Sequence, residues 1–508
     1  MMRRFLNPLA ISRPILLLVL LLGSYFRFSY LLRSGPFVDE FATLLAAKGI
    51  VERGLPILPS GLLYGHGPLS SYLEAPFVYL FGLDTWMARL PDLLLGLLTI
   101  PLVYLAGRRI STPRAGLIAA LLLTLDGEAI IWSGRARPYA LEQSLALLAV
   151  LLFYEAGTRE EGSPYLWAGS LAFLAALFAH AESVFLFFPL FLGLLLLMGP
   201  RRALRWKVGA AFLLCGLGVV TLLLLQEWMG MGERFETISR SRPLFVPSWD
   251  LVKGLRPLAS FFLSRGRIIP TILTLGGLGF LLVDRRREGR LKLAFLYLIL
   301  GLALAEMATL IGQSWQHPRY IFLLLPIFFL CSAVSLEALL SQGERALGRV
   351  GVGTPGISFL LTAIALSVLL LFSVPGAIAA SGQRELGYEQ AFNYVRERWR
   401  ADDKVMTVSP AACGVYLPRC DFFAIQKGYE IYVMRERGGI WIDRWLGSAL
   451  LDSVEALSDA LQGGSRVWFV VDGERFQTRY EGDFKELVEE EMMVVFQDEG
   501  VFVFQTKG

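Results

Sequence analysis

The stretch Pro14-Ile15-Leu16-Leu17-Leu18-Val19-Leu20-Leu21-Leu22 opens an apolar run that continues to Leu32. A helix needs roughly 20 apolar residues to cross the hydrocarbon core of a bilayer, and this run is long enough. Comparable runs recur at 91–107, 115–131, 138–156, 165–180, 182–199, 208–226, 268–283, 291–311, 319–340 and 357–375. The sequence therefore predicts a polytopic α-helical membrane protein with about eleven transmembrane helices.

The composition agrees with this fold class. Of 508 residues, 55% are hydrophobic and 18% are charged, whereas a soluble domain has about 25% charged residues. Lys and Arg total 48 against 44 Asp and Glu, which gives a formal net charge of only +4. This balance excludes a typical cytosolic enzyme, and nothing in it indicates nucleic-acid binding.

The first run begins after Arg3 and Arg4, as the apolar part of a signal peptide does. It extends through Arg27, and no small-residue cleavage site follows it. We therefore expect a retained first helix.

Basic clusters mark alternate ends of the predicted helices. They precede span 1 and follow spans 2, 6, 8 and 10, in the loops with Arg108-Arg109-Arg114, Arg201-Arg202-Arg205-Lys207, Arg285-Arg286-Arg287-Arg290 and Arg345-Arg349. Because cytoplasmic loops are rich in Lys and Arg, the N-terminus is expected in the cytoplasm. The protein itself is expected in the inner or plasma membrane. The loops at 33–90, 126–137, 227–267 and 312–318 would then face outward. Loop 227–267 reads as a mobile cover over the site or as an amphipathic interfacial segment.

After Pro375 the apolar runs stop. Residues 377–508 contain β-like runs at 466–471 and 494–496 and helix-like stretches at 385–399, 453–462 and 483–491. Alternating strands and helices predict a small α/β domain. The chain would thus comprise a transmembrane domain, 1–376, and an exterior periplasmic or extracellular domain, 377–508.

The four cysteines divide between these parts. Cys215 and Cys331 fall inside predicted spans and are expected to be buried thiols. Cys413 and Cys420 lie in the exterior domain, where an oxidising compartment favours a disulfide between them. No Cys-x-x-Cys metal motif occurs.

The first outer loop places two adjacent carboxylates, Asp39 and Glu40, just beyond the first span. A carboxylate at the membrane interface can remove a proton from an acceptor hydroxyl or bind a cation. The structural alternative is that Asp39 caps a helix from Phe41 to Ile50. The same loop contains His66, which is either a hydrogen-bond donor to a phosphate or a local structural residue. An interfacial helix that ends near Phe81 follows it. Arg89, at the edge of span 2, is expected to extend its guanidinium to the interface.

The other outer loops are dense in charge. The second contains Asp126, Glu128, Arg135 and Arg137, and Glu142 follows at the start of span 4. Such groups are expensive at a membrane face unless they pair with one another or carry function. The last loop ends in Pro318-Arg319-Tyr320, where a guanidinium at a helix start is placed to hold a phosphate. Convergence of these groups on one face favours a site.

Together these motifs resemble the GT-C glycosyltransferases, and among them the protein O-mannosyltransferase and aminoarabinose transferase group (glycosyltransferase families 39 and 83). The resemblance covers roughly residues 1–340. It rests on Asp39-Glu40, His66-Gly67-Pro68-Leu69, Ala88-Arg89-Leu90-Pro91, Gly107-Arg108-Arg109, Ala136-Arg137-Pro138-Tyr139-Ala140-Leu141 and Pro318-Arg319-Tyr320.

The resemblance implies an enzyme that uses a polyprenyl-phosphate sugar and a lipid, glycan or protein acceptor at the outer face. It places Asp39 at the catalytic acid position with Glu40 beside it, and His66, Arg137, Arg319 and Tyr320 near the donor phosphate. Relatives commonly carry Gln-Glu where this chain has Gly134-Arg135, so the second carboxylate would be Asp126, Glu128 or Glu142, or be absent. Whether Asp39 also holds a divalent cation, Mg or Mn, stays open.

Chemistry then suggests a single displacement with Asp39 as base and inversion at the anomeric carbon; retention would require a covalent carboxylate. Two other classes share these features. A lipid-linked glycan flippase or transporter would place its charges nearer the midplane, and a polysaccharide polymerase or ligase also has outer arginines.

Overall fold

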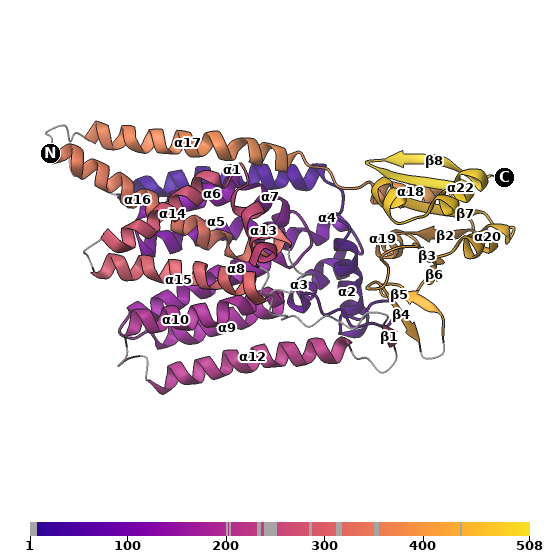
Figure 1. Ribbon diagram of the computed structural model, residues 1–508, viewed down its shortest axis with the longest axis horizontal. Coiled ribbons are helices and arrows are strands. Elements are labelled where there is room, and N and C mark those ends of the chain that lie inside the picture. Colours follow the sequence, from indigo (N-terminus) through magenta and orange to yellow (C-terminus); the bar gives the residue numbers. More distant parts are fainter. Residues whose placement is uncertain are drawn as a thin grey trace.

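The computed structural model describes residues 8–199, 202, 205–230, 235–237, 251–283, 287–310, 317–349, 355–436 and 439–507. A helical bundle and a C-terminal sheet domain lie end to end, with short helices between them (Figure 1). The bundle helices are α1 (Pro8–Arg33), α5 (Leu90–Ile110), α6 (Pro113–Leu125), α7 (Gly127–Ser133), α8 (Tyr139–Thr158), α9 (Ser163–Ala179), α10 (Phe187–Met198), α12 (Trp206–Gly230), α13 (Leu251–Phe262), α14 (Ile268–Val283), α15 (Arg287–Leu310), α16 (Leu325–Arg349) and α17 (Pro355–Ser381).

Each predicted apolar run has a helical counterpart. In the part of the chain that the structure describes, eight helices are long and apolar enough to cross a membrane. The pair α6 and α7 would form a ninth span, and Ser163–Ala179 and Ile268–Gly279 are shorter apolar helices. The prediction of a polytopic helical membrane protein is therefore confirmed.

One predicted span is broken. Residues 115–131 read as one helix, but α6 and α7 meet at an angle of 66°. Asp126 lies at the break and its carboxylate accepts a hydrogen bond from Ala129 N at 3.0 Å, which caps α7. A residue that competes for backbone hydrogen bonds ends one helix and begins the next.

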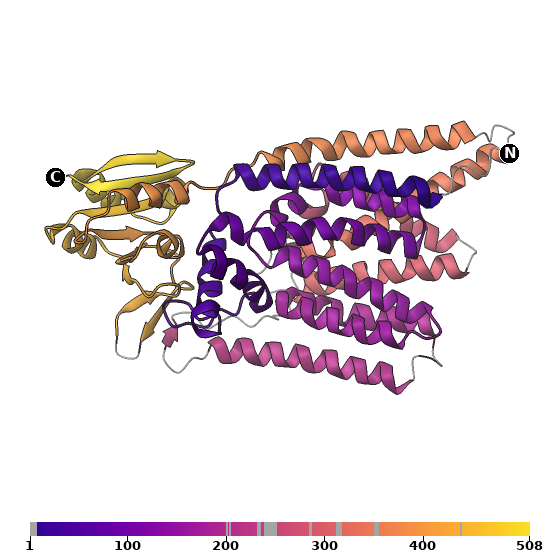
Figure 2. The same cartoon turned by 180° about the vertical axis from the view of Figure 1, so that it is seen from behind.

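The core of the bundle lies around α8 and α16, since 78% of the apolar stretch of each helix is buried. The corresponding share is 28% in α12 and 11% in α17. These two helices flank the bundle on opposite sides, as the front and rear views both show (Figures 1 and 2). The large exposed apolar side chains of α12 and α17, such as Leu213, Leu217 and Leu371, are suited to contact lipid.

Three short helices cover the end of the bundle that faces the C-terminal domain. They are α2 (Glu40–Arg53), α3 (Pro68–Phe81) and α4 (Thr85–Ala88). The expected helix after Asp39 and the expected interfacial helix are both present. Phe41, Ala42 and Leu45 of α2 belong to the hydrophobic core of the C-terminal domain, so α2 joins the two parts of the molecule.

The C-terminal domain has the predicted α/β character. Its strands are β2 (Lys404–Thr407), β3 (Phe422–Ala424), β4 (Val433–Glu436), β5 (Trp441–Asp443), β6 (Ala449–Leu451), β7 (Val467–Asp472), β8 (Met492–Asp498) and β9 (Val501–Thr506). Its helices are α18 (Tyr388–Glu397), α19 (Pro410–Tyr416), α20 (Val454–Gln462), α21 (Gly473–Thr478) and α22 (Gly482–Glu491).

The sheet order is β1-β4-β5-β6-β3-β2-β7-β9-β8. Strands β6, β3, β2 and β7 are parallel, with Val405 opposite Trp468 and Met406 opposite Phe422. All residues of β7 are buried, as its continuous apolar run requires. The edge strand β1 (Phe235–Thr237) comes from the segment after α12 and pairs antiparallel with β4.

Two expectations need adjustment. Helix α17 continues through Pro375 to Ser381, so the folded domain begins later than residue 377. Cys413 and Cys420 are free: the Cys413 thiol donates to Arg419 O at 3.6 Å and that of Cys420 to Phe422 O at 3.9 Å, so the predicted disulfide is not formed. Residues 231–234 and 238–250 of the predicted cover 227–267, and residues 312–316 of loop 312–318, lie outside the described residues.

Candidate active site

Asp39 precedes the first turn of α2 but does not cap it. Its backbone is helical, and its side chain accepts no hydrogen bond from the helix. Instead Asp39 Oδ2 accepts a hydrogen bond from Arg319 Nη1 at 3.2 Å, across a sequence separation of 280 residues. The Asp39 side chain is 41% exposed. The capping alternative therefore fails, and the carboxylate is accessible.

Arg319 is held at the start of η3 (Pro318–Leu324). The His317 side chain caps this short helix by accepting from Arg319 N at 3.2 Å. Arg319 Nη2 donates to Tyr320 Oη at 3.1 Å. Its Nε is buried and has no hydrogen-bond partner within the described ranges. This guanidinium thus keeps a free donor next to Asp39.

Arg137 reaches Asp39 from a second direction. Its Nη1 donates to Asp39 O at 3.1 Å, to Thr43 Oγ1 at 3.1 Å and to Tyr64 Oη at 2.9 Å. Its buried Nε also lacks a partner among the residues described. Two guanidinium groups from different loops therefore meet at Asp39.

His66 is brought to the same region by the adjacent glycine. Gly67 has a φ of +76°, and a Cβ there would lie 2.8 Å from Ala179 O and 2.9 Å from Pro138 Cβ. Only glycine allows this close approach of the loop to the start of α8 and the end of α9. The His66 ring lies 5.7 Å from that of Tyr64. Desolvation by the surrounding protein and the charges of Arg444 and Arg137 lower the pKa of His66, so its imidazole is neutral at pH 7.

Glu40 has a different environment from the one expected. It is fully buried and forms a two-pronged ion pair with Arg89, at 2.7 Å from Nε and 3.0 Å from Nη2. It also accepts from Phe37 N at 2.7 Å and Ala136 N at 2.9 Å. A carboxylate with these four bonds holds loops together. Arg89 does not extend to the interface, because burial against Glu40 holds it inside.

The second loop places most of its charges in structural pairs. Asp126 is bonded twice to Arg267, at 2.7 and 2.8 Å. Glu128 accepts from Trp132 Nε1 at 2.7 Å. Arg135 contacts Glu385 and lies 4.0 Å from the Phe37 ring centroid. Neither Asp126 nor Glu128 contacts Asp39 in the described hydrogen bonds and ion pairs, and Arg267 was not singled out from the sequence.

Glu142 is part of a buried cluster behind the Asp39 region. It approaches His180, and Ser183 Oγ donates to its Oε1 at 2.9 Å. Glu182 contacts the same imidazole. In the described ranges, Glu142, His180 and Glu182 are the one group of three residues spaced to hold a metal ion, and it does not contain Asp39. The sequence did not predict the contribution of His180, which adjoins two apolar spans as an isolated polar residue.

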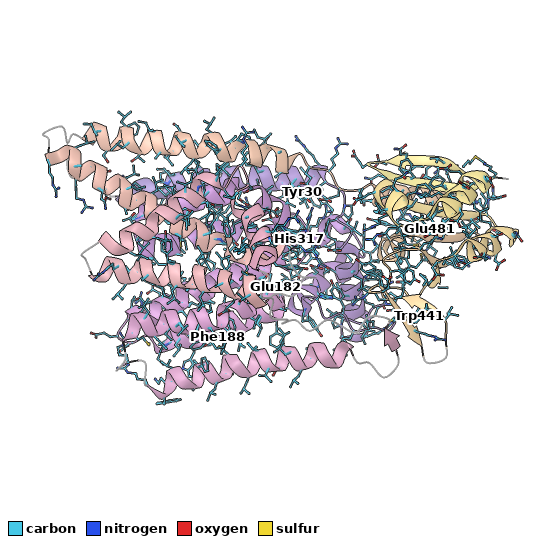
Figure 3. The ribbon with its side chains drawn as sticks, in the orientation of Figure 1. Tyr30, Glu182, Phe188, His317, Trp441 and Glu481 are labelled. Atoms are coloured by element: carbon cyan, nitrogen blue, oxygen red, sulfur yellow. The ribbon has the colours of Figure 1, made fainter. Side chains whose placement is uncertain are left out.

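Aromatic rings connect this cluster to the arginine site. The His180 ring lies 5.1 Å from that of Tyr139 and stacks on Tyr320 at 6.1 Å. Tyr320 in turn accepts from Arg319. Figure 3 shows Glu182 and His317 in the same region of the bundle, toward the end covered by α2 and α3.

A separate cavity of about 600 Å³ lies between the C-terminal end of α1, α4 and α18, and is lined by Arg33, Arg89, Glu389, Asn393 and Tyr416 among others. Asp39, Arg137 and Arg319 do not line it. The convergence of functional groups and this cavity are therefore distinct features of the bundle end that faces the C-terminal domain.

Comparisons with known proteins bear on the fold. The family described as dolichyl-phosphate-mannose-protein mannosyltransferase matches residues 65–226, a segment that contains His66 and Arg137 but neither Asp39 nor Arg319. None of the curated proteins matches the chain in sequence.

Solved structures match nearly the whole chain. ArnT from Cupriavidus metallidurans in the apo state has a TM-score of 0.61 and 14% identity, covering 98% of this chain and 97% of that one. The same protein bound to undecaprenyl phosphate gives a TM-score of 0.61 and 13% identity, with coverages of 99% and 98%. An oligosaccharyltransferase from Archaeoglobus fulgidus in the apo form gives 0.53 and 14% identity over 91% of this chain and 69% of that one. The chain is thus an integral membrane protein with the fold of the GT-C glycosyltransferases, and it resembles the mannosyltransferase and ArnT group of that superfamily.

Proposed function

We propose that this protein transfers a sugar from a polyprenyl-phosphate donor to an acceptor hydroxyl at the outer face of the membrane. The observation that carries the proposal is the meeting of two guanidinium groups at Asp39, whose carboxylate is accessible. Arg319 donates to this carboxylate and Arg137 to the backbone carbonyl, and each keeps an unused buried Nε–H. Guanidinium groups with free donors are suited to a lipid phosphate. ArnT, which shares the fold, has been solved with undecaprenyl phosphate.

In the proposed reaction, Asp39 takes the proton from the acceptor hydroxyl. The hydroxyl oxygen then attacks the anomeric carbon, and the bond from that carbon to the phosphate oxygen breaks. The electron pair of this bond leaves with the lipid phosphate, whose added charge Arg319 and Arg137 balance. A single displacement of this kind inverts the anomeric carbon.

Arg319 has a double role in this mechanism. Without donor it pairs with Asp39 at 3.2 Å. A bound phosphate would compete for the guanidinium and release the carboxylate to act as base. The neutral His66 imidazole remains a candidate donor to the phosphate through an N–H, without adding charge.

The residues at Asp39 do not suit a divalent cation. Its carboxylate pairs with the cation Arg319, Arg137 donates to its backbone carbonyl, and within the described residues no histidine or second carboxylate joins it in a metal-ligand group. Positive neighbours disfavour a second positive charge at that place. The proposed reaction therefore uses no ion at Asp39.

The test is transfer from a panel of radiolabelled polyprenyl-phosphate sugars by the purified full-length protein, with products identified by mass spectrometry. Loss of a general base lowers the rate by about 10²–10⁴-fold, which is the expectation for Asp39→Asn. Glu52→Gln is the matched control, because Glu52 lies on the same helix and is 48% exposed.

Undiminished transfer by Asp39→Asn would remove Asp39 from the role of base. Sugar that crosses a liposome membrane without a new glycosidic bond would instead favour the flippase alternative. A product with the anomeric configuration of the donor would contradict a single displacement.

A further inference from the structure

The cluster of Glu142, His180 and Glu182 is a second concentration of chemistry in the bundle. Glu142 lies in the first turn of α8, and His180 and Glu182 lie where α9 passes into η2 (Ala181–Leu186). One ligand atom from each residue lies within 4.8 Å of the other two. All three residues are more than nine-tenths buried.

The polar atoms of this cluster are incompletely satisfied. His180 Nδ1 and Glu182 Oε2 contact each other, and neither atom has a hydrogen-bond partner outside this pair in the described part of the chain. The ion pairs described for Glu142 and Glu182 involve only His180, with no lysine or arginine. A buried carboxylate is costly unless a cation or a metal ion balances it. One imidazole can balance at most one of the two carboxylates, so a second positive charge would be needed to balance the pair.

The spacing of His180 and Glu142 suits two ligands of one metal ion, and Glu182 contacts the same imidazole nitrogen. His180 Nδ1 lies 3.6 Å from Glu142 Oε2. Ligands at bond lengths of about 2.0–2.2 Å in a tetrahedral site lie about 3.3–3.6 Å apart. Ser183 Oγ, which donates to Glu142 Oε1, supplies the kind of outer hydrogen bond that orients a ligating carboxylate.

The donor set selects among ions. Two carboxylate oxygens and one neutral imidazole carry a net charge of −2, which a divalent cation balances. Imidazole is a ligand of transition metals, whereas Mg²⁺ and Ca²⁺ prefer oxygen ligands alone. We propose that Glu142, His180 and Glu182 bind one divalent transition-metal ion of the Zn²⁺ class, with one coordination position left open.

This site is separate from Asp39 but is connected to it. The His180 ring packs against Tyr139 and stacks on Tyr320, which accepts a hydrogen bond from Arg319. An ion bound here fixes the orientation of His180 and, through the stacked ring, that of Tyr320. The ion is thus placed to position the arginine site rather than to touch the reacting atoms.

The test measures metal binding alone and does not depend on the proposed reaction. Purified full-length protein is stripped with chelators, dialysed against Zn²⁺ and analysed by mass spectrometry for metal content. We expect about one ion per chain, as a three-ligand site binds one metal. Glu142→Gln and Glu182→Gln should each lower the affinity at least about 10-fold, since even outer-shell changes cost 10–100-fold.

Glu155→Gln is the matched control, because Glu155 lies in the last turns of the same helix and pairs with Arg109 and Arg159. It should bind zinc like the unmodified protein. Equal binding by all three variants would overturn the proposal, as would the absence of specifically bound metal in the unmodified chain.

X-ray absorption of the zinc-loaded, unmodified protein gives a readout that does not rely on the folding of a variant. The expected spectrum has one imidazole and oxygen ligands at about 2.0–2.2 Å. Sulfur ligands at about 2.3 Å would place the metal at cysteines such as Cys413 and Cys420 and would overturn the assignment.

Discussion

Asp39 and Glu40 are neighbours in sequence, yet they occupy opposite kinds of environment. Glu40 is fully buried, and its oxygens accept two hydrogen bonds from Arg89 and two from backbone N–H groups. Asp39 is 41% exposed and meets Arg319 through one bond at 3.2 Å. The difference separates a carboxylate that holds the fold from one that is free to react.

The largest expected effect comes from removing the charge at Glu40. Glu40→Gln leaves the buried Arg89 guanidinium without a counter-ion, and breaking a buried pair in this way costs about 3–5 kcal/mol. The variant should lose folded yield and unfold at a clearly lower temperature in detergent, as fluorescence-detected size exclusion would measure. Glu52→Gln, exposed on the same helix, serves as the control; an unchanged melting temperature in Glu40→Gln would show that the pair does not hold the fold.

Glu74 sharpens the comparison, because it is a buried carboxylate without an arginine partner. Burial raises the pKa of Glu74 to about 8, although Arg137 and a hydrogen bond from Ser70 oppose this. The folded-state pKa of Glu74 lies above the ordinary value of 4.5. The contribution of Glu74 to the free energy of unfolding is therefore fully present below pH 4.5 and is lost as the pH rises through about 8. Each pKa unit corresponds to about 1.4 kcal/mol, so the loss is expected to reach several kcal/mol.

Glu74→Gln should remove this pH dependence, so that the melting temperature falls less between pH 5 and 8 than in the unmodified protein. A melting temperature profile parallel to that of the unmodified chain would contradict a neutral Glu74.

Arg319→Lys tests the proposed reactive environment of Asp39. Lysine keeps the charge but loses the planar fork that reaches Asp39 and Tyr320 together. Hydrogen bonds between charged groups are worth about 1.5–3 kcal/mol, so we expect sugar transfer to fall roughly 10–100-fold in a labelled-donor assay. Arg345→Lys, exposed near the other end of α16, is the control, and equal activity of the two variants would argue against a phosphate role for Arg319.

The smallest expected effect concerns the support of Arg137. Thr43→Val keeps the shape of the side chain but removes one of the three hydrogen bonds at Arg137 Nη1. One such bond contributes about 1 kcal/mol, so the transfer rate should fall roughly fivefold without a change in folded yield. A rate equal to that of the unmodified protein would mean that Thr43 does not orient Arg137.

The sequence predicted the features that depend on local composition. Apolar length located the membrane helices, and the sorting of charges placed Asp39, Arg137 and Arg319 at one end. Pairing across long separations could not be predicted in the same way. Glu40 was grouped with Asp39 because they are adjacent, and its contact with Arg89 depends on how α5 packs beside the first loop. His180 and Glu182 carried no motif, and only the packing of α8 against η2 brings Glu142 to them.

The most direct test of the account separates binding from chemistry in Asp39→Asn. Affinity for an unreactive polyprenyl phosphate is measured by titration, and the rate of sugar transfer is measured in a single turnover with prebound labelled donor. We predict affinity within about threefold of the unmodified protein and a single-turnover rate at least about 10²-fold lower. A normal single-turnover rate, or loss of binding that accounts for the whole defect, would contradict the assignment of Asp39 as the base.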